Sequence, residues 1–317
     1  MIETTHTQHT IRDGKTMSKS ALKMMDDENG RLWDIHRNTP RVEGGTYTDG
    51  NSIVLTPRQH MAIHGNLRER SAELEILKSA VDSRRQIMKL YNKINNQVLA
   101  FKRGVDERDA ETVKRLEASG AEIAAELKLQ DKRVVKAIKG YAESDALSRA
   151  ALEVKGVGPI TVAHCAVYID VTKARHASSL WKYAGLHCPN HERYINGEAG
   201  GGNKTLRTAL YTLADSQIKS RGPYRKVYDQ VKDRLSKSDK ETKTRNTQGN
   251  WVIKPWKDVK PCHRDGAAKR AIMKHFLADY WFVGRTLLGL EAGPCYAEAQ
   301  LKGEHRTVQP TERGWKW

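Results

Sequence analysis

The stretch Lys155-Gly156-Val157-Gly158-Pro159-Ile160-Thr161 decides the fold of the second half of this chain. Glycine alone accepts positive φ cheaply, so Gly156-Val157-Gly158 predicts a tight turn between two helices. Pro159 favours the first turn of the second helix, where its missing N–H costs nothing. Such a turn directs backbone N–H groups outward beside a helix N-terminus and forms an anion site. We therefore expect Lys155, Gly156, Val157, Gly158 and Thr161 to contact DNA phosphates, although an ordinary helix–helix turn would use the same residues.

A glycine-rich loop, Gly197 to Asn203, lies further along the chain, and basic residues border it. Backbone without side chains can approach a phosphate closely. The sequence therefore predicts a second set of DNA contacts, made by Arg193, Gly201, Gly202, Asn203, Lys204 and Arg207. A helix is expected next, from Thr205 to Ser220, with Leu206, Leu210, Leu213 and Ala214 on one face.

The composition bounds the class of protein. The chain has 317 residues, a net charge of +17 and 38% hydrophobic residues, which predicts two or three domains and a nucleic-acid partner. No apolar run approaches the roughly twenty residues of a membrane span, so we expect no membrane partner. The first residues contain no apolar segment of a signal peptide. Four scattered cysteines form no C-x-x-C pair, and a cytoplasmic, reduced protein is expected.

Residues 1–30 are expected to be a flexible tail, and residues 31–66 a small module. In that module Asp49-Gly50 predicts a hairpin between two β-prone runs. His60 and His64 are four residues apart and would share one face of a helix, where they could bind one metal ion. The predicted order is strand, hairpin, strand and helix.

This module resembles the HNH, or ββα-metal, endonuclease fold over about thirty residues. The resemblance implies that His36, His60 and His64 are metal ligands and that Asn51 orients the general base. Arg37 stands where the family has a histidine base, and an arginine stays protonated and cannot accept a proton from water. Arg37 could instead bind the scissile phosphate, so the candidate catalytic residues are His36, Arg37 and Asn51. The chemistry would need a divalent cation, Mg²⁺, Mn²⁺ or Zn²⁺. Alternatively, these histidines are ordinary surface or core residues.

Residues 67–150 are expected to form a helical arm. Apolar residues recur at three- and four-residue steps in two series, with Gly104-Val105-Asp106-Glu107 breaking the pattern between them. This predicts two long helices that fold back on each other or pair as a coiled coil with another chain. The arm is thus either a dimerisation element, giving a homodimer or higher oligomer, or the wall of a helical bundle. The apolar positions are Leu74, Leu77, Val81, Met88, Tyr91 and Val98 in the first series and Val113, Leu116, Ile123, Leu127 and Val134 in the second.

Residues 151–305 are expected to be a helical DNA-binding domain, followed by a loose tail at 306–317. The lysine-rich segment 232–262 is expected to be an exposed loop or insertion, with Trp251 and Trp256 either stacking on unpaired bases or docking the loop on the core. Ala267 to Leu288 predicts an apolar core helix.

The ordered series Gly156-Val157-Gly158-Pro159, Asp170, Tyr183-Ala184-Gly185-Leu186, Gly202-Asn203, Ala267-Ala268-Lys269-Arg270 and Tyr296-Ala297-Glu298-Ala299 resembles the C-terminal domain of insertion-sequence transposases with a DEDD-type catalytic domain, the bridge-RNA-guided recombinases. The resemblance covers roughly residues 150–305. It implies DNA binding, recombination chemistry, a coiled-coil arm and a guide or structured RNA as a further partner. It also implies a catalytic serine in the glycine-rich loop, but no serine lies between Ser179 and Ser216. The acidic catalytic domain is replaced at the N-terminus by the HNH-like module.

We therefore expect a mainly α protein: a small ββα HNH-like module, a long helical hairpin or coiled-coil arm, and a helical C-terminal domain with a helix-hairpin-helix. The expected function is DNA binding by a transposase- or recombinase-related protein of a mobile element or phage. One alternative is a metal-dependent HNH endonuclease that the C-terminal domain targets to DNA. Another is a non-catalytic RNA-binding or scaffold protein.

Overall fold

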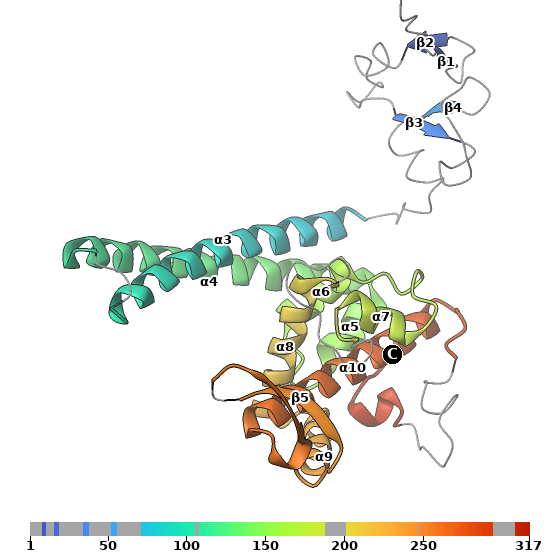
Figure 1. The fold of residues 1–317 in the computed structure, drawn as a ribbon. Helices are drawn as coiled ribbons and strands as arrows, with labels where there is room; N and C mark the ends of the chain where they lie inside the picture. Colours follow the sequence, from blue (N-terminus) through green and yellow to red (C-terminus); the bar gives the residue numbers. More distant parts are fainter. Residues whose placement is uncertain are drawn as a thin grey trace, which may run out of the picture. The chain divides into compact units, whose positions relative to one another are not determined.

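The computed structural model describes residues 8–10, 16–18, 34–37, 52–55, 71–104, 108–187, 201–246, 248–293 and 308–317. The chain divides into two compact units, Met1–Ser71 and Ala72–Trp317. The second unit is mainly helical, as predicted (Figure 1). Within the described residues, no helix combines the length and the apolar character that a bilayer crossing requires.

The first unit contains two antiparallel strand pairs. Strands β1 (Gln8–Thr10) and β2 (Thr16–Ser18) pair within the segment that was expected to be a flexible tail. Strands β3 (Asp34–Arg37) and β4 (Ser52–Leu55) pair so that His36 lies opposite Ile53 and Arg37 opposite Ser52. The two predicted strands and their pairing are therefore confirmed, whereas the turn predicted at Asp49-Gly50 lies outside the described residues. The predicted helix with His60 and His64 falls outside the described residues.

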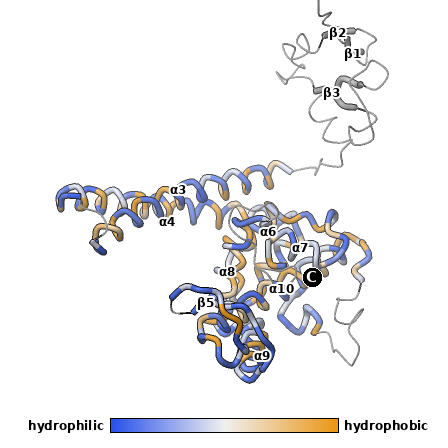
Figure 2. The backbone as a smooth tube through the Cα atoms, in the orientation of Figure 1, coloured by the Kyte–Doolittle hydropathy of each residue, from blue (hydrophilic) through white to orange (hydrophobic). Residues whose placement is uncertain are grey.

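The predicted arm is a hairpin of two long helices, α3 (Ala72–Lys102) and α4 (Ala110–Ser144), which pack along each other (Figure 1). The break falls where it was predicted, because α3 ends just before Gly104, which has φ +69°. Asp109 caps α4 by accepting a hydrogen bond from the amide of Thr112 at 2.7 Å. Apolar and polar residues alternate along both helices (Figure 2), and Arg84 Nε donates to Asp131 Oδ1 across the seam at 2.5 Å.

The C-terminal domain is built on α10 (Pro261–Leu287), its long apolar helix. It begins six residues before the predicted start, with Pro261 in its first turn. It packs against α5, α7, α8 and α9, and Ile272, Met273, Phe276 and Leu277 are almost completely buried. The other helices of this domain are α5 (Ala146–Glu153), α6 (Pro159–Tyr168), α7 (Ala177–Tyr183), α8 (Lys204–Lys219) and α9 (Arg225–Ser236), of which α6 packs against α4, α5 and α8.

The lysine-rich segment 232–262 is not the loop that the sequence predicted. It contains the end of α9, a β-hairpin of β5 (Glu241–Arg245) and β6 (Trp251–Pro255), and the short 3₁₀ helix η3 (Trp256–Asp258). In β5 β-prone residues alternate with charged ones, so that successive side chains face opposite sides of the hairpin. On one side of β5, Thr244 is buried against α10.

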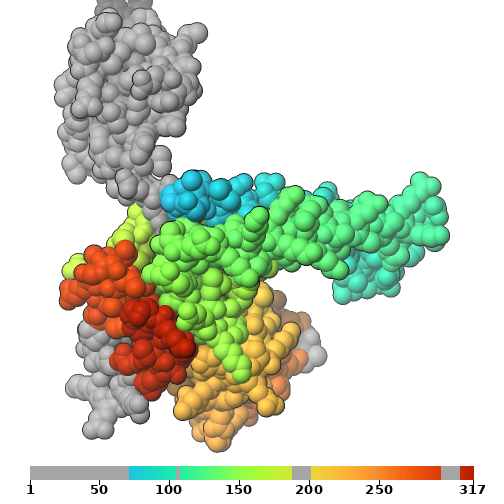
Figure 3. Space-filling view, turned by 180° about the vertical axis from the view of Figure 1, so that it is seen from behind, coloured from blue at the N-terminus to red at the C-terminus, as the bar shows by residue number. Residues whose placement is uncertain are grey.

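The C-terminal segment is not a loose tail over residues 308–317. It forms the 3₁₀ helix η4 (Pro310–Arg313) and packs against the body of the domain, where it is drawn in red in Figure 3. Trp315 is 1% exposed and lies 5.7 Å from Phe276 between ring centroids. Arg313 forms a buried ion pair with Asp279 of α10 at 2.7 Å. The prediction failed because the partners of this segment lie on helices far away in the sequence.

Candidate nucleic-acid interface

Helices α5 and α6 meet at the predicted glycine turn. Gly156 has φ +81°, which only glycine adopts without strain, and Gly158 is the N-cap of α6 with φ −80° and ψ 148°. Pro159 occupies the first turn of α6, as predicted. The carbonyl of Gly158 accepts from the amides of Thr161 and Val162, whereas the amides of Gly158 and Ile160 have no acceptor within the described residues. The helix N-terminus thus presents amide donors at this turn.

The turn is fixed to the C-terminal end of α8 by Gln217, which is completely buried. Its Nε2 donates to the carbonyl of Lys155 at 2.8 Å, and its Oε1 accepts from the amide of Tyr224 at 3.2 Å. A Cβ at Gly156 would meet Ser220 Oγ and would lie 2.8 Å from Gln217 Nε2. A Cβ at Gly222 would lie 2.7 Å from the carbonyl of Lys155. Both glycines are therefore needed for close packing of the turn against α8.

Three cations surround this turn: Lys155 in the turn itself, and Lys219 and Arg221, which flank Ser220 at the end of α8. All three are exposed. None of them forms an ion pair in the part of the chain that the structure describes. Arg221 has φ +49°, a conformation that is uncommon for a side chain other than glycine, asparagine or aspartate. We name these three residues the turn cluster, and its charge is available to an anion.

Two predicted contact residues of this turn point into the protein. Val157 is 7% exposed, and Thr161 is 5% exposed with its hydroxyl 3.5 Å from the carbonyl of Ala209. These side chains therefore pack α6 against the core, and the contact of the two residues with DNA stays a prediction. Lys155, Gly156 and Gly158 remain at the surface edge of the turn.

The second predicted site begins where α7 ends. Gly185 has φ +66° and ends α7 with a Schellman motif. The amide of Leu186 donates to the carbonyl of Trp181 at 2.8 Å, and the amide of Gly185 donates to the carbonyl of Lys182 at 3.0 Å. Gly202, with φ +70°, lies directly against it, since a Cβ on Gly202 would be 2.7 Å from Gly185 Cα. The close approach that these glycines permit is between two backbone segments of the protein itself.

Asn203 and Arg207 also serve this junction. Asn203 caps α8 by accepting from the amide of Leu206 at 3.0 Å, and its own amide donates to the carbonyl of Tyr183 at 2.6 Å. Its Nδ2 donates to the Tyr183 hydroxyl at 3.1 Å, and Arg207 Nη1 donates to the carbonyl of Gly185 at 3.4 Å. Gly201 precedes this cap, and Lys204 is exposed on the first turn of α8. Arg193 lies outside the described residues.

Helix α8 separates the two predicted sites. The turn cluster lies at its C-terminal end, and the Gly185–Gly202 junction, followed by the cap residue Asn203, lies at its N-terminal end. Its 16 residues correspond to a helix of about 24 Å. The predicted contact residues are therefore two groups and not one continuous site. The turn cluster is the better candidate for an anion site, because Asn203 and Arg207 of the other group already form hydrogen bonds with backbone groups of the protein itself.

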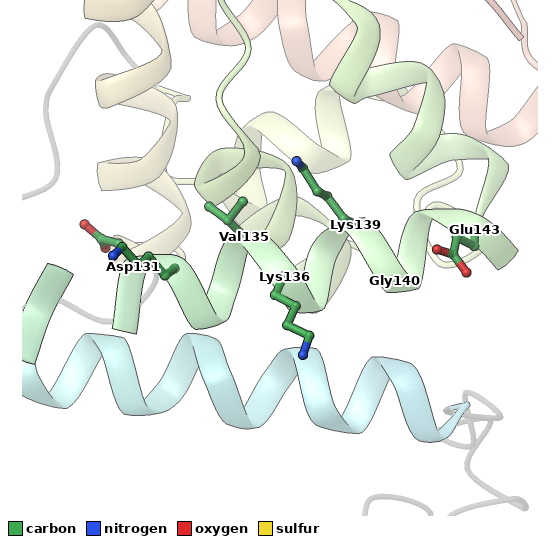
Figure 4. A pocket seen from close by; sticks show the side chains of 7 residues that line it. Asp131, Val135, Lys136, Lys139, Gly140 and Glu143 are labelled. Carbon is green, nitrogen blue, oxygen red and sulfur yellow. The ribbon is translucent and has the colours of Figure 1, made fainter. Parts of the chain in front are cut away.

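A shallow groove of about 620 Å³ follows one face of α4 (Figure 4). All of its lining residues come from α4, so it does not enclose a ligand between elements. Lysines contribute much of the lining, and they are exposed. The lining residues are Asp131, Lys132, Val135, Lys136, Lys139, Gly140 and Glu143. The groove has the character of a basic helix surface and not of a catalytic pocket.

The predicted metal site stays a prediction. His36 and Arg37 are placed on β3, next to the position where β4 begins, whereas Asn51, His60 and His64 lie outside the described residues. Among the described residues, no three histidine, cysteine, aspartate or glutamate side chains form a cluster that could hold a metal ion.

Gln217, Lys219 and Arg221 were not singled out from the sequence. A signal for Gln217 was present, because it continues the apolar face of Leu206, Leu210 and Leu213 and is its one polar member. A polar side chain on a buried helix face must find partners. The Arg221-Gly222-Pro223 sequence also marks a turn. Neither feature identifies the partner, which is the turn 62 residues earlier in the chain.

Comparison with known families agrees with this region of the fold. Residues 148–230 match the family model described as Transposase IS116/IS110/IS902 family. The match begins in α5 and ends in α9, so it contains the glycine turn, Gln217 and the Gly185–Gly202 junction. A search of curated proteins finds no match.

Proposed function

We propose that this protein binds the sugar–phosphate backbone of DNA through the α5–α6 turn and the turn cluster. The carrying observation is the combination of two amides at the N-terminus of α6, those of Gly158 and Ile160, with three exposed cations; neither group has a partner among the described residues. Such donors are typical of phosphate contacts that position a protein on DNA without reading bases. The net charge of +17 supports the same partner.

The match of residues 148–230 to a transposase family supports a transposase-related role, and the proposal assigns this binding to DNA recombination or transposition by a mobile element or phage. The proposal does not include the serine chemistry of the related transposases, because residues 180–215 contain no serine. A guide or structured RNA remains part of the proposal as a second nucleic-acid partner.

Binding of the full chain to unrelated 30-base-pair duplexes, measured by fluorescence anisotropy across a salt titration, tests the proposal. Lys155→Ala and Arg221→Asn should each weaken binding to every duplex similarly. Each should also lower the slope of log K against log [salt] by about 1, because one phosphate contact is lost. Asparagine is chosen at position 221 because it tolerates positive φ.

Lys114→Ala is the matched control, because Lys114 is an exposed lysine near the start of α4, at the far end of the arm from α5. It should leave the affinity and the salt slope unchanged. Equal losses for Lys155→Ala and Lys114→Ala would remove the turn cluster from the interface and leave only diffuse charge.

A second candidate function is metal-dependent DNA cleavage by the N-terminal module. The antiparallel pairing of β3 and β4 favours it, because the HNH fold requires such a pair before its metal-binding helix. His36, His60 and His64 would hold the divalent cation, which would polarise the phosphate and stabilise the leaving oxygen. Arg37 would bind the phosphate, and Asn51 matches the residue that orients the general base, although Arg37 at the base position cannot itself accept the proton of the attacking water.

Plasmid nicking in Mg²⁺, Mn²⁺ or Zn²⁺ tests this second candidate. Nicking that His60→Ala abolishes, while duplex binding persists, would support the endonuclease. Tight DNA binding without nicking in any of the three metals would eliminate it.

A further inference from the structure

The β5–β6 hairpin carries an apolar and aromatic surface that the core does not use. Trp251 is 54% exposed and Ile253 is 67% exposed, which makes them the two most exposed large residues of this region. Large apolar side chains gathered in one place on a surface usually mark a binding site. The hairpin lies beyond the residues that match the transposase family.

The hairpin is firmly held on its other side. Thr244 is buried, with its hydroxyl 3.4 Å from His263 Nδ1 of α10. At the open end of the strands, the amide of Trp256 donates to the carbonyl of Lys240 at 3.0 Å. Arg264 Nη1 donates to the carbonyls of Lys257 and Val259, both at 2.8 Å. The exposed side is therefore one face of a fixed ribbon.

The strand register brings cations to the same face. Arg245 lies opposite Trp251, and Lys243 lies opposite Ile253. Residues opposite each other in an antiparallel pair project to the same face. The Arg245 guanidinium lies 4.8 Å and the Lys243 ammonium 5.5 Å from the centre of the Trp251 ring. Both cations come from β5, and Trp251 is still 54% exposed beside them.

An indole ring beside a guanidinium and an ammonium group matches a planar, negatively charged ligand. A base stacks on the ring, and its phosphates meet the cations. Bases inside an intact duplex are already stacked and do not offer a free face, so unpaired bases fit this surface better than duplex DNA. Five-residue strands give the face a length of about 17 Å, which accommodates a short run of nucleotides.

We propose that this face, formed by Lys243, Arg245, Trp251 and Ile253, binds single-stranded nucleic acid by stacking an unpaired base on Trp251. The site is separate from the turn cluster, so it holds whether or not α5–α6 binds duplex DNA. It gives the protein contact with a strand exposed by duplex opening or with an unpaired loop of RNA.

Fluorescence anisotropy of the full chain with 5′-labelled (dT)15, (U)15 and a 15-base-pair duplex tests the proposal. Trp251→Ala should weaken single-strand binding at least about fivefold and leave duplex binding within twofold, because stacking on an aromatic ring contributes on the order of 1–3 kcal/mol per base. Trp251→Phe should restore most of the loss, since phenylalanine keeps an aromatic face. Comparison of (dT)15 with (U)15 tells whether DNA or RNA is the strand that is bound.

Trp317→Ala is the matched control, because Trp317 is also an exposed tryptophan, at 46%, but lies at the C-terminus. It should change neither affinity. The thermal melting curve of each variant, followed by circular dichroism, shows whether the hairpin still folds. Unchanged single-strand binding in a folded Trp251→Ala would overturn the proposal. Equal losses for single strand and duplex would do the same, as would a loss that Trp317→Ala reproduces.

Discussion

Gln217 donates a hydrogen bond from Nε2 to the carbonyl oxygen of Lys155, across 2.8 Å, and so joins the end of α8 to the turn between α5 and α6. The same side chain accepts from the amide of Tyr224, at the start of α9. One buried amide thus satisfies a carbonyl and an N–H group of two separate turns. The anion site depends on this contact, because it fixes the Lys155 backbone beside Lys219 and Arg221.

Replacing this amide should destabilise the protein and weaken DNA binding. Gln217→Leu keeps the approximate size of the side chain but leaves the Lys155 carbonyl and the Tyr224 amide without partners. An unsatisfied buried polar group costs about 1–3 kcal/mol, so we expect the free energy of unfolding to fall by at least about 2 kcal/mol. Urea denaturation measures it. A loss below about 0.5 kcal/mol would mean that the turn finds other partners.

Substitutions at the two glycines of the turn should weaken DNA binding for different reasons, one through loss of stability and the other with the fold intact. Gly156→Ala should lower the free energy of unfolding by more than about 1 kcal/mol, because alanine resists φ +81° and its Cβ would collide with Ser220. Gly158→Val should fold normally, since φ is −80° and a Cβ there meets no atom within 4 Å. It should nonetheless weaken duplex binding, because the side chain stands where a phosphate must approach the amides.

The two measurements are a melting temperature and a duplex dissociation constant for each variant. The interpretation of Gly158 as a phosphate contact fails if Gly158→Val folds and binds DNA like the unmodified protein. Gly156→Ala serves as the comparison, because its loss of binding should follow its loss of fold.

Arg313 and Trp315 should prove essential to stability although they lie within five residues of the chain end. Arg313 Nη1 contacts both carboxylate oxygens of Asp279, at 2.7 and 2.9 Å, and Tyr224 donates to the same carboxylate at 2.6 Å. Arg313→Met leaves this buried carboxylate without its cation, so we expect a loss of about 3–5 kcal/mol near neutral pH. Burial raises the pKa of Asp279 to about 6.

The loss should be smaller at pH 5 than at pH 7.5, because Arg313 lowers the pKa of Asp279 and its removal lets the carboxylate take up a proton at a higher pH, after which it no longer needs a cation. Denaturation of Arg313→Met at pH 7.5 and pH 5 measures this difference. Trp317→Ala is the control and should cost almost nothing, since Trp317 is exposed. A loss that is the same at both pH values would show that Arg313 acts through packing alone.

Acid should destabilise the domain through His164 of α6. This side chain is 5% exposed, and burial lowers its pKa below the ordinary 6.5, partly offset by the bond between Nδ1 and the carbonyl of Ile160 at 2.7 Å. The folded state keeps the imidazole neutral, whereas the unfolded chain binds a proton once the pH falls below 6.5. Stability is therefore fully present above 6.5 and is lost as the pH falls below that value.

The comparison of His164→Gln with the unmodified protein isolates this effect, because groups such as Asp279 titrate in both. Between pH 7.5 and pH 5.5, the free energy of unfolding should fall less steeply in the variant. Parallel curves would assign the pH dependence to other groups.

The sequence predicted those parts of the fold that local chemistry determines. Glycine and proline at 156–159 require a turn followed by a helix start, and the apolar periods of α3, α4 and α10 require helices. The glycines at 185 and 202 were interpreted less well. Positive φ and close approach could be expected at Gly202, but the sequence does not say whether a phosphate or another backbone segment makes the approach.

The hairpin and the C-terminal segment were missed for a different reason. In β5 and β6 the lysines obscured a period of two in Thr242, Thr244, Val252 and their neighbours, and Gly249 marked the turn. The burial of Trp315 depends on Phe276 and Tyr280, more than thirty residues earlier. Long-range packing of this kind is set by the tertiary structure and has no local signal.

The helical arm should mediate self-association. Leu90 and Leu99 of α3 and Leu129 of α4 are 44%, 37% and 42% exposed, so the hairpin leaves part of its apolar surface uncovered. A second copy could cover this surface by forming a four-helix bundle, whose helices bury such residues.

Light scattering after size exclusion should show a dimer or a higher oligomer for the full chain. Leu90→Glu should convert it to a monomer, because a charge cannot be buried unpaired in that interface. Lys89→Glu, at the exposed position directly before Leu90, is the control for added negative charge and should leave the oligomer intact. A monomeric unmodified protein would rule out the arm as a dimerisation element.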